Sequence, residues 1–320
     1  MKRIIFSSLI FILFLTVFYT CKKEVKDEKW DDTINSGFIR IACDENFKDL
    51  MDAEIAVFEA HNPKAFVIPI YTSETEAIRL MLIDSVRFAL TTRDLTAKER
   101  AELEKKYLRA KKHLIAFDGL ALITNKSNED SILSLSNLKK ILSGEITEWA
   151  QINQKSSAGT IRVIFGNKES GVLRYAVESI SPVDSLSSNI YSLNDNNAVL
   201  EKVSQMPNAL GVIGVNALSD ENSSNAIKYK NKIRLVRISK EETATVKNSY
   251  LPYAGDIRQE KYPLWRSVYV ILSDPKNGLS SGLSIFLANE VGQKLILKSG
   301  LLPITDSQNI QVNIIDEYPK

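Results

Sequence analysis

The sequence predicts an α/β fold, because short apolar runs alternate with amphipathic segments from Phe38 onward. The first apolar runs, Phe38–Ala42, Phe66–Tyr71 and Val86–Leu90, have the length of strands. Apolar residues recur at helical spacing from Phe47 to Phe58, between the first two of these runs. Strands that alternate with helices in this way are typical of sheets with helices packed on them.

Two capping boxes mark the starts of helices in this region. Ser73-Glu74-Thr75-Glu76 and Thr96-Ala97-Lys98-Glu99 each place a hydroxyl three residues before a glutamate. In such a box the hydroxyl accepts a hydrogen bond from the backbone, and the glutamate reaches back to the capping residue. The first box therefore predicts a helix that extends through Ile83, and the second predicts a charged helix after Thr96.

The remaining elements follow from the same patterns. His113–Thr124 is an apolar run interrupted by Asp118-Gly119, where we expect the chain to pass between two lobes. The other predicted elements are helices at Leu135–Leu142, after Ser170-Gly171, at Asn197–Met206 and at Leu283–Lys298 before Gly300, strands at Ile161–Phe165, Leu210–Val215 and Leu264–Leu272, and an irregular segment at Leu251–Tyr262.

The first 21 residues have the pattern of a secretory signal peptide. Met1-Lys2-Arg3 is basic, and Ile4–Phe18 is apolar apart from three hydroxyl residues. The apolar run is short for a helix that crosses a bilayer, which needs about 20 apolar residues. An uncleaved anchor is the alternative interpretation.

Cys21 ends this apolar run and resembles the lipidation site of a bacterial lipoprotein. The polar residues 22–37 after it are predicted to form a tether, and two acyl chains would hold the protein on a membrane. A free or buried cysteine is the other interpretation of Cys21. If Cys21 is lipidated, Cys43 is the only remaining thiol, so no disulfide within the chain is expected.

Composition and motifs exclude several classes of protein. The formal net charge is only +2, and the basic residues are dispersed, which argues against a nucleic-acid-binding role. The chain has two histidines, His61 and His113, and it contains no zinc-protease, nucleophile-elbow, Walker or dinucleotide-binding motif. We therefore expect a protein that is not an enzyme and that holds no cofactor or metal.

Six segments, taken in order, resemble the phosphate-binding proteins of bacterial phosphate ABC transporters, the PstS type. They are RDLTAKE (93–99), FDGLALITN (117–125), LKKILSGEITEW (138–149), MPNALGV (206–212), YPLWRSVYVIL (262–272) and GQKLILKSGLLP (292–303). This resemblance implies a type II periplasmic-binding-protein fold, with two α/β lobes joined by two crossover strands. It places one lobe at residues 38–117 plus 262–320 and the other at residues 118–261.

Ligands of such sheets bind beyond the carboxyl ends of the strands, and helix N-termini there favour oxyanions. Four loops have this placement, and the resemblance implies that they are the ligand-contacting segments. In chain order, the first to the fourth loop are Asp44-Glu45-Asn46, Thr72-Ser73-Glu74-Thr75, Thr91-Thr92-Arg93-Asp94 and Lys168-Glu169-Ser170-Gly171. Each also has a structural interpretation: Ser73 and Ser170 as helix caps, Asp94 as the start of a turn, and Arg93 as the partner of a nearby carboxylate. The predicted ligand-binding residues are Asn46, Ser73, Thr75, Thr92, Arg93, Asp94, Ser170 and Gly171.

The same loops depart from the family pattern. Asp44 and Glu45 replace a serine-rich loop, and Glu74 and Glu76 replace a turn rich in glycine and serine. In the fourth loop, Gly166 and Val172 stand where the family has arginine and threonine. Carboxylates near a phosphate cost about 4 kcal/mol per close charge pair at an effective dielectric of about 20. Arg93, Lys168 or Arg174 would have to neutralise them.

These observations predict a lipid-anchored protein of the cell envelope, either facing the periplasm or exposed on the cell surface. It would capture a small oxyanion, with phosphate the leading ligand, for an ABC permease, and its phosphate affinity would be weak or lost. The alternative is a degenerate binding protein that acts as a structural or partner-binding lipoprotein.

Overall fold

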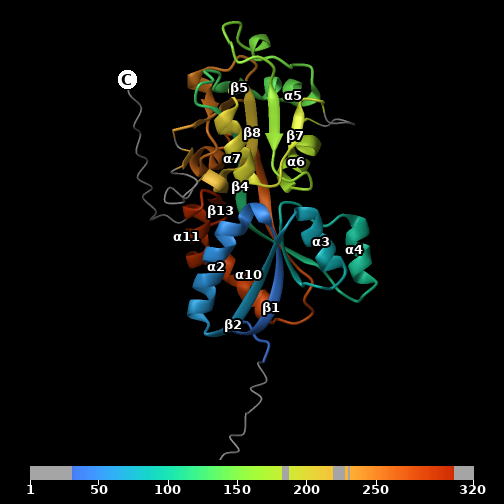
Figure 1. Ribbon diagram of the computed structural model, residues 1–320. Coiled ribbons are helices and arrows are strands. Elements are labelled where there is room, and N and C mark those ends of the chain that lie inside the picture. Colours follow the sequence, from blue (N-terminus) through green and yellow to red (C-terminus); the bar gives the residue numbers. More distant parts are fainter. Residues whose placement is uncertain (1–30, 182–186, 219–227, 230, 306–320) are drawn as a thin grey trace, which may run out of the picture. The chain divides into compact units, whose positions relative to one another are not determined.

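The computed structural model describes residues 31–181, 187–218, 228–229 and 231–305 (Figure 1). The described residues from Asp32 onward belong to one compact unit. The predicted signal peptide, the predicted lipidation site Cys21 and most of the predicted tether lie outside the described residues. Within the described part of the chain, no helix is both long and apolar enough to cross a membrane.

The N-terminal part is a parallel sheet with helices between its strands. Its elements are β1 (Ser36–Asp44), the 3-10 helix η1 (Glu45–Phe47), α2 (Lys48–His61), β2 (Lys64–Thr72), α3 (Glu74–Leu82), β3 (Phe88–Thr91) and α4 (Ala97–Glu104). β1 pairs in parallel with both β2 and β3, so the carboxyl ends of all three strands meet at one edge. Figure 1 shows α2 on one side of these strands and α3 and α4 on the other.

The middle part repeats this arrangement. Its elements are β4 (Lys111–Asn125), β5 (Ile132–Ser134), α5 (Leu135–Ser143), η2 (Trp149–Gln151), β6 (Arg162–Phe165), α6 (Gly171–Tyr175), the π-helix η3 (Ala176–Ile180), β7 (Ile190–Ser192), α7 (Asn196–Gln205), β8 (Ala209–Gly214), η4 (Val215–Leu218), β9 (Ile233–Leu235), β10 (Arg237–Ser239), η5 (Val246–Asn248), β11 (Ser249–Tyr250) and α9 (Ala254–Arg258). The chain ends with β12 (Trp265–Leu272), α10 (Leu279–Ala288), α11 (Glu290–Lys298) and β13 (Leu302–Pro303).

Two strands connect the two halves of the sheet. β4 pairs with β12 from Lys111 to Gly119 and then with β8 from Leu120 to Thr124. The strand order is β2-β1-β3-β12-β4-β8-β6-β7, with β9 and β13 also paired to β4. The predicted fold class is therefore confirmed: two α/β lobes are joined by two crossover strands, and Asp118-Gly119 lies at the crossing.

Alternation along the strands gives each lobe two apolar clusters, one on each face of its sheet. Ile41 and Cys43 of β1 pack in a cluster with α2 and α10, whereas Ala42 between them packs with α3 and α4. In the other lobe, Leu122 of β4 packs with α5 and α6, and Ile123 packs with α7. The lobe boundaries at residues 38, 117 and 262 remain a prediction.

Three local predictions differ from the structure. The segment predicted as one helix from Leu283 to Lys298 is two helices, because the Asn289 side chain accepts hydrogen bonds from the Val291 and Gly292 N–H groups and starts a new one. The segment predicted to be irregular contains the short helix α9. In the first capping box, Ser73 caps α3 as expected, but Glu76 pairs with Arg79.

Candidate functional site

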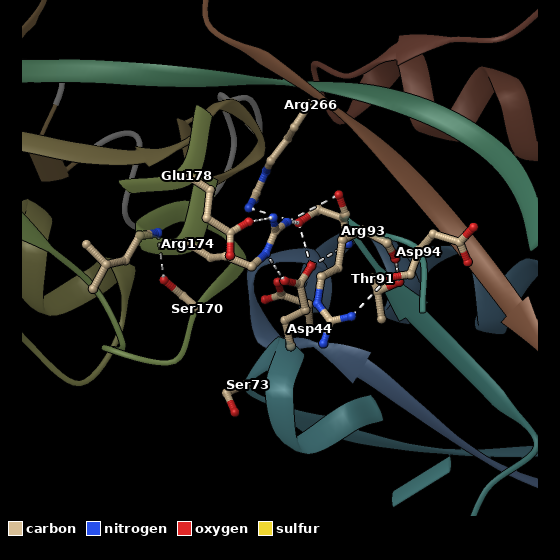
Figure 2. A network of polar contacts seen from close by, with 12 residues as sticks. Asp44, Ser73, Thr91, Arg93, Asp94, Ser170, Arg174, Glu178 and Arg266 are labelled. Atoms are coloured by element: carbon tan, nitrogen blue, oxygen red, sulfur yellow. Dashed lines mark hydrogen bonds and ion pairs between the residues drawn. The ribbon is translucent and has the colours of Figure 1, made fainter. Parts of the chain in front are cut away.

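The carboxylate of Glu74, at the start of α3, is the shared acceptor in a polar cluster that also includes Thr92, Arg174 and Arg266. Figure 2 shows the polar contacts of this region, with Arg174 and Arg266 labelled. Its Oε1 accepts hydrogen bonds from the Thr92 backbone N–H at 2.6 Å and from Thr92 Oγ1 at 2.5 Å. Its Oε2 accepts from Arg174 Nε at 2.6 Å. Glu74 is 1 % exposed, so both oxygens are withdrawn from water and held by donors of the protein.

These donors determine the ionisation of Glu74. Burial alone would raise the pKa of this carboxyl, because it disfavours the charged form. The charge and hydrogen bond of Arg174, the hydrogen bond from Thr92 and the charge of Arg266 outweigh burial, so the pKa is lowered. Glu74 is therefore a buried anion at neutral pH.

Arg174 reaches Glu74 from α6, which follows the fourth predicted ligand loop. Ser170 caps this helix by accepting from the Leu173 N–H, and Arg174 lies one turn further along. Its other nitrogens bind Glu178 at 2.9 Å and approach the hydroxyl of Thr92 at 3.2 Å. One arginine thus joins α6 to residues of α3 and of the loop after β3.

Gly171 brings the backbone of α6 directly against the same cluster. A Cβ atom at this position would lie 2.5 Å from Thr92 Oγ1, 2.8 Å from Arg266 Nη1 and 2.9 Å from Glu74 Oε1. Real Cβ atoms do not make contacts this short, so any side chain at position 171 would displace the groups of this cluster.

The first predicted loop lies next to this cluster. Asp44 is fully buried, and its Oδ1 accepts from the Asn46 N–H at 3.0 Å, while its Oδ2 has no hydrogen-bond partner among the described residues. Burial, the largest influence, raises the Asp44 pKa to about 6; Arg266 opposes this rise and Glu74 adds to it. Asn46 accepts from Asn196 Nδ2 at 2.9 Å, which joins the loop to α7.

Arg93 and Asp94 of the third loop bind neighbouring residues of their own lobe. The Arg93 guanidinium forms two hydrogen bonds of 2.7 Å with Glu99, which lower the pKa of Glu99 to about 2. Asp94 binds Arg100 at 2.8 Å and Lys112 at 2.9 Å. The interpretation of Arg93 as the partner of a nearby carboxylate is therefore confirmed.

A second buried ion pair lies where the crossover strands meet. Arg266 of β12 is opposite Asp118 of β4 in the sheet, and its Nε and Nη2 both lie 2.9 Å from Asp118 Oδ2. Burial raises the pKa of Asp118, although the charge of Arg266 acts in the opposite direction. Arg266 Nη1 also donates to Thr92 Oγ1 at 3.3 Å, which connects this pair to the Glu74 cluster.

A cavity of about 320 Å³ opens beside the cluster, between the third loop, α6 and β12. Its lining is rich in guanidinium and hydroxyl groups, which are donors suited to an anion, but each of its arginines already faces a carboxylate. Among the described residues, no group of His, Cys, Asp and Glu side chains could hold a metal ion. The lining residues are Thr92, Arg93, Asp94, Arg174, Tyr175, Ser179, Trp265, Arg266, Ser267 and Tyr269.

The structure brings most of the predicted ligand residues together, but in different roles. Thr92 donates two hydrogen bonds to Glu74, and the backbone of Gly171 passes close to the cluster. Ser73 caps α3 while donating to Glu169 at 3.3 Å. Thr75 is exposed, so it lies outside the cluster.

Sequence reasoning missed that Glu74 is the acceptor at the centre of the cluster. It also missed Asp118 and Arg266, whose only signal was a charged residue within the apolar runs His113–Thr124 and Leu264–Leu272.

Comparison with known proteins agrees with this architecture. Residues 28–290 match the family model described as the PBP superfamily domain. The phosphate-binding protein PstS of Borreliella burgdorferi is 24% identical over 315 residues, which cover 95% of this chain and 99% of that protein. PstS of Bacillus subtilis is 21% identical and covers 89% of this chain and 87% of its own.

Solved structures show the same fold. A protein of Clostridium perfringens with bound phosphate has a TM-score of 0.68 at 19% identity, covering 84% of this chain and 100% of its own. An ABC-type phosphate transport receptor of Vibrio cholerae has a TM-score of 0.62 at 21% identity, covering 83% and 100%. The chain belongs to the PBP superfamily, and it resembles the phosphate-binding PstS-type proteins over nearly its whole length.

Proposed function

We propose that this chain is an extracytoplasmic solute-binding protein that captures a small oxyanion between its lobes for an ABC transporter. One observation carries the proposal. The Thr92 N–H, the Thr92 hydroxyl and the Arg174 guanidinium converge on a single carboxylate from residues of both predicted lobes. This donor set is suited to an oxyanion, and phosphate is the first ligand to test because the relatives named above are phosphate-binding proteins. Capture requires no catalytic step.

The pairing of charges supports a low affinity for phosphate. Arg93 faces Glu99, Arg174 faces Glu74, and Arg266 faces Asp118. A phosphate that entered this region would have to replace one of these carboxylates, or it would remain beside them and be repelled. The departures in the loop sequences and the paired arginines thus favour the same outcome.

We expect the wild-type protein to bind phosphate with a dissociation constant above about 1 µM. This corresponds to a binding free energy of less than about 8 kcal/mol in magnitude. The measurement is calorimetric titration of the full chain in detergent with phosphate and, separately, with sulfate. Arg174→Met should weaken binding at least about tenfold, because a charge-assisted hydrogen bond is lost. Arg79→Met is the matched control, since Arg79 is exposed and pairs with Glu76. Submicromolar binding of phosphate would contradict the weak-affinity expectation.

A second candidate function is a partner-binding envelope protein without a small ligand. The buried Glu74 carboxylate favours it, because the donors of the cluster are already satisfied within the chain. Failure of the wild-type chain and of the Glu74 variants described below to bind phosphate, sulfate or arsenate would support this candidate over oxyanion capture.

We also propose that Cys21 anchors the protein to a membrane, because it follows the apolar run of the N-terminal segment. Cys21→Ser should release the protein into the aqueous phase of a detergent partition, or leave it at the mass of the unprocessed chain. Cys43→Ala, at the other cysteine of the chain, is the control and should stay with the membrane. Unchanged partition and mass of the Cys21 variant would refute the anchor.

A further inference from the structure

We propose that Glu74 is an internal ligand of the oxyanion site: its carboxylate occupies the anion position and joins the two lobes there. The inference rests on the proposed function, since it assumes that the donors around Glu74 are those that a solute would use. It goes further in naming the residue that decides whether a solute can bind.

The contacts of Glu74 are those expected of a bound anion. Three donors reach its two oxygens within 2.6 Å, and they comprise a main-chain N–H, a hydroxyl and a guanidinium. The carboxylate is buried and ionised, and it belongs to the first residue of α3, so its position is fixed by a short connection to the sheet. An anion held by the chain itself has a high effective concentration, which a solute must overcome.

The same carboxylate connects elements from both lobes. Arg174 and Gly171 come from α6, whereas Glu74 and Thr92 come from α3 and the loop after β3. Figure 2 shows Arg174 extending from α6 toward the cluster, next to Arg266. A Cβ atom at Gly171 would lie 2.9 Å from Glu74 Oε1, so the backbone of α6 passes close to this carboxylate. Removal of the carboxylate therefore takes away the hydrogen bond from Arg174 as well as a charge.

Glu76 provides a control within the same helical turn. It lies two residues after Glu74, it is more exposed, and its carboxylate pairs with Arg79 on the surface of α3. Glu74→Ser and Glu76→Ser therefore change the net charge equally, but only the first removes the acceptor shared by Thr92 and Arg174.

The experiment compares the full-length wild type with Glu74→Ser, Glu74→Gln and Glu76→Ser in detergent. Phosphate binding is measured by equilibrium dialysis with labelled phosphate, and protection of the Thr92 N–H is measured by amide hydrogen exchange. We expect Glu74→Ser to bind phosphate at least about tenfold more tightly than wild type, because Arg174 and Thr92 become available. Its Thr92 N–H should exchange faster without phosphate, and phosphate should restore protection. Glu76→Ser should behave like wild type.

Glu74→Gln keeps the shape of the side chain and an oxygen acceptor for Thr92, but it loses the charge that Arg174 binds. Its phosphate affinity and its exchange rate at the Thr92 N–H should both lie between those of wild type and Glu74→Ser. If the serine variant does not fold, Glu74→Gln is compared with wild type instead.

The possible outcomes separate this inference from the proposed function. Faster exchange at Thr92 in Glu74→Ser without binding of phosphate, sulfate or arsenate would support the internal ligand and contradict oxyanion capture. Wild-type exchange at Thr92 in Glu74→Ser would overturn the internal ligand. Measurable phosphate binding of equal affinity in wild type and Glu74→Ser would overturn it as well. If the two affinities are equal, phosphate binding by the wild type would still support oxyanion capture.

Discussion

Replacing Glu54 by leucine is expected to stabilise the protein, and the gain is expected to grow as the pH rises. Glu54 lies in α2 beside Leu50, Met51 and Phe58, it is fully buried, and neither carboxyl oxygen has a hydrogen-bond partner among the described residues. Burial raises its pKa from 4.5 to about 9. The folded protein therefore keeps a proton on Glu54 at a pH at which the unfolded chain has lost it.

The sign of the pH dependence follows from this difference. Below a pH of about 4.5, both states hold the proton, and the ionisation of Glu54 does not affect stability. As the pH rises toward 9, the unfolded chain is increasingly favoured, so the wild-type protein loses stability over that range. Over this range, each pH unit lowers the free energy of unfolding of the wild type by about 1.4 kcal/mol at most. Relaxation of the structure around Glu54 makes the decrease smaller.

Urea unfolding at pH 4.5 and pH 8 provides the measurement. At pH 8, Glu54→Leu should unfold with a free energy about 2–4 kcal/mol higher than wild type, and the difference should shrink at pH 4.5. Glu54→Gln should show the same pH dependence with a smaller overall gain, because its amide remains buried without a partner. Asp49→Asn, at an exposed position of the same helix, is the control for charge. An equal difference between Glu54→Leu and wild type at both pH values would contradict the assignment.

Breaking the ion pair between the crossover strands should have a similarly large effect in the opposite direction. Arg266→Met should destabilise the protein by about 3–5 kcal/mol at pH 7, because it leaves the carboxylate of Asp118 buried without its cation. The side chains of Arg266 and Asp118 are 1 % and 0 % exposed, so water cannot replace the lost partner. Urea unfolding again gives the free energy.

Two further variants test the cause of this loss. The double variant Asp118→Asn/Arg266→Met should recover part of the lost stability, since no uncompensated charge remains. Arg87→Met removes a more exposed arginine that pairs with Asp84, and it should change stability by no more than about 1 kcal/mol. If Arg266→Met lowered the free energy of unfolding no more than Arg87→Met does, the ion pair of Arg266 with Asp118 would not stabilise the crossover strands.

The fold could be predicted largely because its signals are local. The sheet follows from apolar runs, and the starts of α3, α4 and α6 follow from the hydroxyl groups of Ser73, Thr96 and Ser170. The break at Asn289 was missed because apolar residues on both sides continue the same helical spacing. A side chain that caps a helix inside such a pattern leaves only a weak signal.

The site was harder to predict because its contacts join residues far apart in the sequence. Glu74 and Arg174 are separated by 100 positions, and Asp118 and Arg266 by 148. The sequence shows that Glu74 is an acidic residue in the second predicted loop. Only the fold shows that its carboxylate turns inward to Arg174, while that of Glu76 turns outward to Arg79.

The donation from the Thr92 backbone has an evolutionary consequence. Any residue except proline supplies a main-chain N–H, so drift at position 92 does not abolish this donor. The residue at position 74 decides whether the donor meets a carboxylate of the chain or remains available. Because codons for glutamate and glycine differ by a single nucleotide, an internally occupied site and an open one are adjacent in sequence space.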